Sequence, residues 1–232
     1  MAQTTCYSGG PARRGFRSAS AVIRMFILVL ALVVGAAGAA RAATISYNVT
    51  VNTSALAGTQ GFLDFQFLPG GLDALPAFAA VAMFASFDAV LAPTADRAGD
   101  ATGTLPGTVT LGNSQGFNDL FQGITFGSTF SFNLTLSGAA LDPGGSALSG
   151  TAFSLLLFGA DGMTPLVTAD PDGRIVSLQI GPNGAVAVST FPQVNGPPVA
   201  DVTAAVPEPT TLLLVGAGVV AIAARRRRAR TE

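Results

Sequence analysis

The chain has 232 residues, a formal net charge of −1 and 49% hydrophobic residues, with no histidine and a single cysteine, Cys6. No lysine is present either, so arginine supplies all of the basic charge. These absences exclude a Ser-His-Asp triad, a Schiff-base lysine and a histidine zinc site.

The N-terminal segment predicts a signal peptide over residues 1–42. Four arginines, Arg13, Arg14, Arg17 and Arg24, precede an apolar stretch from Met25 to Ala40. Small residues at Ala40 and Ala42 then form a signal-peptidase site, so we expect a mature chain that begins at Ala43.

Two other interpretations of this segment remain open. Arg13-Arg14-Gly15-Phe16 resembles a twin-arginine signal, but the preceding Ala12 and the very apolar stretch 25–32 favour the general secretion route. An uncleaved membrane helix is the third interpretation. It is disfavoured because the apolar core is short and ends in a cleavage pattern.

The remaining body is acidic and lacks cysteine. Between Ala43 and Val206 it carries eleven aspartates against two arginines, a net charge of −9, because ten of the twelve arginines lie in the two end segments. Such a surface repels DNA, RNA and anionic lipid headgroups. Without disulfides, the body must be stabilised by its own core, which its length allows.

Alternation of apolar and polar residues predicts an antiparallel β-sandwich or jelly roll over residues 43–192. The pattern is clear in 44–51 and 63–67, and it runs through 124–137, where Gly127 is expected to mark a bend or bulge. Later strands are expected at 153–158, 166–168, 174–180 and 185–190. The turn chemistry of Gly181-Pro182-Asn183-Gly184 predicts a hairpin between the last two.

Two stretches are ambiguous. The alanine-rich segment 75–91 fits either a buried helix or a buried strand, and its strand neighbours favour the strand. Residues 117–121 suit one helical turn that tucks two phenylalanines under a loop.

The C-terminal region predicts a linker followed by an export signal. Prolines and glycine over 193–205 are typical of a linker that holds the body away from a membrane. Pro207-Glu208-Pro209 keeps the backbone extended, and residues 210–224 form an apolar run long enough for about 22 Å of helix. We expect a short transmembrane helix there, fixed by the cytoplasmic cluster Arg225, Arg226, Arg227, Arg228 and Arg230.

This three-part tail resembles the sorting signal of PEP-CTERM proteins, over residues 206–230. The resemblance implies recognition by an exosortase, a membrane-embedded transpeptidase-like enzyme of Gram-negative bacteria that produce exopolysaccharide. Pro207, Glu208 and Pro209 match the motif itself, which implies a cut nearby, but the cleaved bond is not assigned.

The body also resembles one uncharacterised group of PEP-CTERM proteins. The matching residues lie at 61–67, 117–123 and 168–173. Because that group has no known activity, the resemblance implies a shared fold and no particular chemistry.

The side chains of the body leave three kinds of site to weigh. Asp161, Asp170 and Asp172 are oxygen donors on loops and form a calcium candidate, although Asx turns explain them as well. Glycan binding suits an exported protein, but Trp is absent and Tyr47 is expected in the core with most of the fourteen body phenylalanines. A glycosidase that uses paired aspartates is the least favoured alternative.

The sequence thus predicts an exported, non-catalytic, structural or interaction protein of the cell envelope or matrix, linked to exopolysaccharide and biofilm, with no required cofactor. Its expected partners are signal peptidase, an exosortase, the inner membrane in passing, and exopolysaccharide or matrix proteins.

Overall fold

The computed structural model describes residues 44–142, 144 and 148–205, and in this part the chain folds almost entirely into antiparallel strands. The elements are β1 (Thr44–Asn52), η1 (Ser54–Leu56), β2 (Gln60–Pro69), β3 (Ala77–Phe87), β4 (Val90–Ala98), β5 (Ala101–Gly103), β6 (Val109–Gly112), β7 (Asp119–Thr125), β8 (Thr129–Gly138), η2 (Ala139–Leu141), β9 (Thr151–Gly159), β10 (Arg174–Ile180), β11 (Val186–Thr190), β12 (Pro192–Gln193), β13 (Gly196–Pro198) and β14 (Ala200–Ala205).

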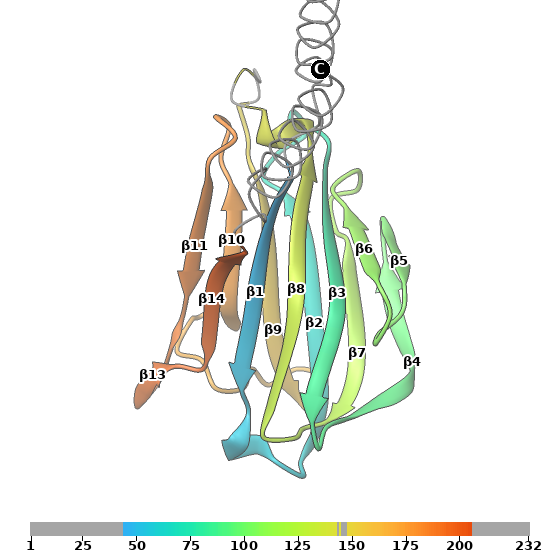
Figure 1. Cartoon of the computed structure of the whole chain (residues 1–232), viewed down its shortest axis with the longest axis vertical. Helices are drawn as coiled ribbons and strands as arrows, with labels where there is room; N and C mark the ends of the chain where they lie inside the picture. Colours follow the sequence, from blue (N-terminus) through green and yellow to red (C-terminus); the bar gives the residue numbers. More distant parts are fainter. Residues whose placement is uncertain (1–43, 143, 145–147, 206–232) are drawn as a thin grey trace, which may run out of the picture. The chain divides into compact units, whose positions relative to one another are not determined.

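Two six-stranded sheets pack face to face (Figure 1). We call them sheet A, in the order β14-β1-β8-β3-β6-β5, and sheet B, in the order β11-β10-β9-β2-β7-β4. The strands β12 and β13 form a separate two-stranded ribbon. The predicted all-β sandwich is therefore confirmed.

The core lies between the sheets because each strand turns its apolar parity inward. On β2, Leu63, Phe65 and Phe67 are fully buried. The ring of Phe65 meets Phe132 of the opposite sheet edge to face, with ring centroids 5.4 Å apart. Burying each such side chain contributes about 1.5–3 kcal/mol, so the repeated alternation is what holds the two sheets together.

The ambiguous alanine-rich segment forms a strand, as favoured. Residues 77–87 make up β3, which pairs with β8 and β6. A register shift between Ala82 and Ala85 contains Met83, whose φ is 55°. Ala77, Ala79 and Val81 are buried, so the inward face of β3 contributes small side chains to the core between the sheets.

The interruption expected at Gly127 is present, but it is a crossover between sheets rather than a bend or bulge within one strand, and the helical turn predicted at 117–121 was wrong. The stretch 124–137 is two strands in different sheets, β7 and β8, and the chain crosses between the sheets near Gly127. No helical turn forms at 117–121, because β7 begins at Asp119 and pairs with β2. Phe117 is half-exposed, whereas the neighbouring Asn118 is fully buried and donates to the carbonyl of Phe67 at 3.0 Å.

The short strand expected at 166–168 was also wrong. The segment is irregular, with a single bridge between Phe158 and Pro165 just before it. Val167 has a φ of 52°, and the hydroxyl of Thr168 donates to the carbonyl of Arg174. These local bonds replace the ladder that a strand would need.

The predicted linker was wrong for most of its length. Pro192, Pro197 and Pro198 fall within the β12–β13 ribbon rather than in a free spacer. The proline-free stretch 200–205 can donate along its whole backbone, and it pairs with β1 from Val51–Ala200 to Ser46–Ala205. The folded body therefore extends to Ala205.

Candidate functional site

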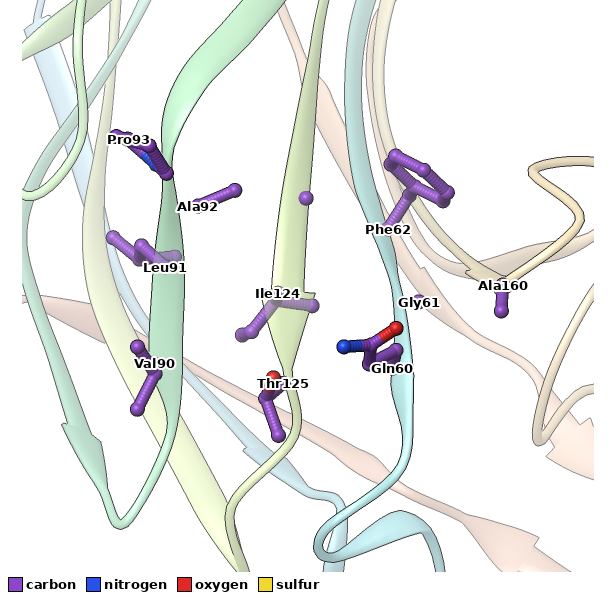
Figure 2. A pocket seen from close by; sticks show the side chains of 11 residues that line it. Gln60, Gly61, Phe62, Val90, Leu91, Ala92, Pro93, Ile124, Thr125 and Ala160 are labelled. Atoms are coloured by element: carbon purple, nitrogen blue, oxygen red, sulfur yellow. The ribbon is translucent and has the colours of Figure 1, made fainter.

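A groove of about 400 Å³ lies on sheet B where β2, β7 and β4 run side by side (Figure 2). Its floor includes Gly61 and Gly123, and of these it is Gly123 whose missing side chain would face the groove. The ring of Phe62 rises on one side and Ala92 with Pro93 on the other. A methyl group added at position 123 would lie 3.0 Å from the Cβ of Ala92, so glycine keeps this groove open.

The groove exists because β4 bulges away from β7. The register between them shifts between Leu91 and Ala95, and Pro93 offers no backbone donor there. Gln122 points toward the core and is 3% exposed. Its side-chain amide donates to the carbonyl of Ala92 at 2.9 Å, which satisfies backbone that the bulge leaves without a ladder partner.

The lining of the groove has no acid or base: its polar side chains are those of Gln60 and Thr125. Groups of this kind can hold a ligand by hydrogen bonds and by contact with the Phe62 ring. The lining contains no carboxylate, imidazole, amine or thiol that could act as a general acid, a general base or an activated nucleophile.

The two most buried carboxyl groups, Asp64 and Asp119, also lie on the outer side of sheet B but do not line the groove. Asp64 is 5% exposed, and its Oδ2 accepts a hydrogen bond from the Gln66 amide at 2.7 Å. Its Oδ1 has no hydrogen-bond partner. Burial raises the pKa of Asp64 to about 7, with a smaller upward contribution from Asp119.

Asp119 is restrained by its neighbours as well. Its Oδ1 accepts the backbone N–H of Ala98 at 3.0 Å. Desolvation nevertheless raises the pKa of Asp119 above its ordinary value. Two neighbouring carboxyl groups with raised pKa values could act as a general acid and base. Neither Asp64 nor Asp119, however, lines the groove.

The structure does not bring Asp161, Asp170 and Asp172, the three aspartates of the calcium candidate, together into one cluster. Arg174 binds Asp170 through two bonds, Nε–Oδ2 at 2.8 Å and Nη2–Oδ1 at 3.1 Å, and its Nη2 also meets Asp172 Oδ2 at 2.7 Å. The bond to Arg174 holds the pKa of Asp170 below its usual range. Among the residues described, no three acidic side chains gather closely enough to hold a metal ion.

Asp161 closes its own turn instead, as an Asx turn does. It accepts from the backbone N–H groups of Met163 and Thr164 at 3.0 and 2.9 Å, and from the Thr164 hydroxyl. The hydroxyl bond is the largest cause that lowers the pKa of Asp161 to about 2.

The phenylalanines divide more evenly than expected, while Tyr47 is buried as predicted. Seven of the fourteen are buried, namely Phe65, Phe67, Phe84, Phe126, Phe130, Phe132 and Phe153. Phe62 stacks on Phe121 at 4.5 Å on the outer side of sheet B, and Phe158 lies 6.0 Å from Phe121. The sequence signal for this outer cluster is that Phe62, Phe121 and Phe158 all fall on the outward parity of paired strands.

Both ends of the described chain lie at one end of the sandwich, because the start of β1 is adjacent to the end of β14. The signal-peptidase site at Ala40 and Ala42 lies outside the described residues. So do Pro207, Glu208 and Pro209, the apolar run 210–224 and the arginine cluster Arg225–Arg230. Within the described part, no helix has the length and hydropathy needed to cross a membrane.

Comparison with known proteins gives one match. Residues 205–228 match the family model of the PEP-CTERM protein-sorting motif, so the resemblance of the tail is confirmed. The matched region begins at the last residue of β14. The comparisons with curated proteins and with solved structures found no match.

Proposed function

We propose that this protein is processed by an exosortase and then acts outside the cell as a non-catalytic structural or interaction component of the envelope or matrix. The observation that carries the proposal is the PEP-CTERM sorting motif at residues 205–228. That motif implies an exosortase as processing partner and a destination at the cell surface or beyond it.

The proposed route has three steps. Signal peptidase removes residues 1–42, and the apolar run 210–224 holds the chain in the inner membrane with Arg225–Arg230 on the cytoplasmic side. The exosortase then cuts near Glu208, which two flanking prolines keep extended. The role of the body in exopolysaccharide or biofilm is part of the same proposal.

The position of the last strand supports processing without damage to the body. β14 ends at Ala205, and Pro207 follows two residues later. A cut at or after Pro207 therefore leaves all of the hydrogen bonds between β14 and β1 in place. The released product would be a complete sandwich.

A non-catalytic role is supported by the residues available. The chain has no histidine or lysine, and the groove on sheet B is lined without ionisable side chains. The buried pair Asp64 and Asp119 lies away from that groove. Binding is therefore the chemistry that these surfaces favour.

The test is mass spectrometry of the mature C-terminus in strains with and without the exosortase. We expect a C-terminus near residues 207–209 in the first strain and an intact Arg225–Arg230 cluster in the second. Glu208→Gln should slow the cut, whereas Glu232→Gln, at the only other glutamate, should not. Persistence of the full chain at the inner membrane beside an active exosortase would contradict the proposal.

Glycan binding by the body is the second candidate function. The favouring observation is that Phe78 and Phe87 are exposed on a strand whose outward neighbours are uncharged hydroxyl and amide side chains.

A further inference from the structure

The outer side of sheet A carries a regular, uncharged surface, here called the polar face. Its central strands, β1, β8 and β3, lie side by side in the layer nearest the viewer in Figure 1. The outward residues that define it are Ser46, Asn48 and Thr50 on β1, Thr129, Ser131, Asn133, Thr135 and Ser137 on β8, and Phe78, Ala80, Ala82, Ala85 and Phe87 on β3.

The polar face is neutral on a body of net charge −9. None of its defining residues, all within the described part, is ionisable. Two carboxylates border it: Asp201 lies opposite Thr50 on the edge strand β14, and the Asp100 carboxylate packs on Gly112, the β6 partner of Phe78. A polymer rich in carboxylate or sulfate would be repelled by the surrounding aspartates, and the face itself has no acidic side chain to pair with a cationic group, so a neutral ligand suits it best.

The side chains of the polar face are ordered by contacts with one another. The Ser46 and Thr135 hydroxyls are 2.9 Å apart, and Thr135 donates to Asn133 Oδ1 at 3.1 Å. Asn133 Nδ2 in turn donates to Asn48 Oδ1 at 3.2 Å. Hydroxyl and amide groups keep donors and acceptors beyond these bonds, so the row can still bond to a ligand.

Two exposed phenylalanines stand at opposite ends of this row. Phe78 is 45% exposed and pairs with Ser137, and Phe87 is 65% exposed and pairs with Thr129. Eight residue steps of β8 separate the partners, or about 26 Å at the usual rise per residue. Between the phenylalanines, β3 turns three alanines outward, which leave a shallow track, and Met83 projects from the register shift with 80% of its surface exposed.

A hollow of about 200 Å³ opens at the Phe87 end of the track. It is lined by Thr50, Ala85, Phe87, Thr129 and Ser131, with Ser86 and Phe130. An aromatic ring beside hydroxyl groups in a neutral hollow is suited to a sugar ring, whose C–H faces pack on the aromatic ring while its hydroxyls bond to the polar row.

We infer that the polar face binds an uncharged polysaccharide that lies along β3 and β8, with sugar rings against Phe78 and Phe87. This inference rests on the second candidate function and gives it a site and a ligand class. A lipid surface is disfavoured because the face is mainly hydroxyls and amides, and a polyanion is disfavoured by the aspartates around it.

The test uses the full-length protein in a zwitterionic, sugar-free detergent, with a β-1,4-glucan, a β-1,3-glucan, a galactomannan and alginate as probes. We expect binding of at least one neutral polymer, no binding of alginate, and little change with added salt. A long oligosaccharide of the bound polymer should bind more tightly than its disaccharide, because only the long one reaches both phenylalanines.

Phe78→Ala and Phe87→Ala should each weaken binding about tenfold, the loss expected for one aromatic platform. Phe117→Ala is the matched control, because Phe117 is 50% exposed but lies in the loop before β7. It should bind as the parent does, and circular dichroism should show that all three variants remain folded.

Three results would overturn the inference: no binding to any neutral polymer, loss of binding in Phe117→Ala alone, or self-association of the protein that both face variants abolish. The last would assign the polar face to a second copy of the chain. Since binding is measured on purified protein and processing in cells, failure here leaves the exosortase proposal unaffected, and the converse also holds.

Discussion

Asp64 is a carboxyl group that points away from the core and yet has lost contact with water. Alternation along β2 correctly assigns its side chain to the outer parity. What the sequence could not provide is its surroundings, because Phe121 and Leu156 become its neighbours only when β7 and β9 pair with β2. Burial is a property of that pairing, so a local pattern misses this carboxyl.

The raised pKa of Asp64 predicts a stability that falls as pH rises. The unfolded carboxyl releases its proton near pH 3.8 and the folded one near 7, so between these values only the folded state holds the proton. The free energy of unfolding should decrease through this window, by up to about 4 kcal/mol, and level off above it. Urea unfolding of the purified protein at pH 5, 6, 7 and 8 measures the effect.

Substitution separates Asp64 from other carboxyls. Asp64→Asn should flatten the pH dependence and raise the free energy of unfolding at pH 8 by about 2 kcal/mol. The control is Asp73→Asn. Hydrogen bonds from Ser149 and Leu148 lower the pKa of Asp73, so removing this carboxyl should not change the fall in the free energy of unfolding between pH 5 and pH 8. A parent protein equally stable at pH 5 and pH 8 would refute the assignment.

At the scale of elements, the crossover from β7 to β8 explains why alternation gave one long strand where two exist. Both strands turn the same parity toward the shared core, so the pattern continues although the chain changes sheets. The groove on sheet B could not be predicted either, because alternation does not show which face of β7 is turned toward the core. On β7 the polar Gln122 points inward and the apolar Phe121 outward, the reverse of the usual rule.

Gly127 is required at this crossover, and its substitution should be costly. A Cβ at this position would overlap the backbone carbonyl oxygen of Phe87 and crowd Ala89. The Thr53 hydroxyl also donates to the carbonyl of Gly127 at 2.8 Å, which fixes the turn. We expect Gly127→Ala to lower the free energy of unfolding by about 2–3 kcal/mol, measured by urea titration.

Gly116→Ala provides the comparison. Position 116 is exposed and has open space around an added Cβ. Its effect should stay within about 0.5 kcal/mol. Equal effects of the two substitutions would show that the crossover tolerates a side chain.

At the scale of the whole molecule, the sequence established a sandwich but not its topology. Turn chemistry identified the β10–β11 hairpin, because both strands and the turn are adjacent in sequence. It could not place β14 beside β1, since the two are separated by the entire body. The proline-rich composition before β14 instead predicted a spacer.

The pairing of β14 with β1 predicts where the chain can be shortened. A chain that ends at Ala205 should match the mature body in stability, because every described strand is retained. A chain that ends at Val199 should melt at a markedly lower temperature, since it exposes the edge of β1 and uncovers Val202, which packs on the core. Thermal unfolding by circular dichroism distinguishes them, and equal melting temperatures would contradict the structural role of β14.

The same pairing has a consequence for timing. A chain that leaves the cell from its N-terminus delivers β1 first and β14 last, with only residues 206–209 between β14 and the apolar run. If the chain crosses unfolded by the general secretion route, sheet A cannot close until translocation is nearly finished. The body would then complete its fold at about the time that it reaches the exosortase. The enzyme would meet a body that has only just acquired its final strand.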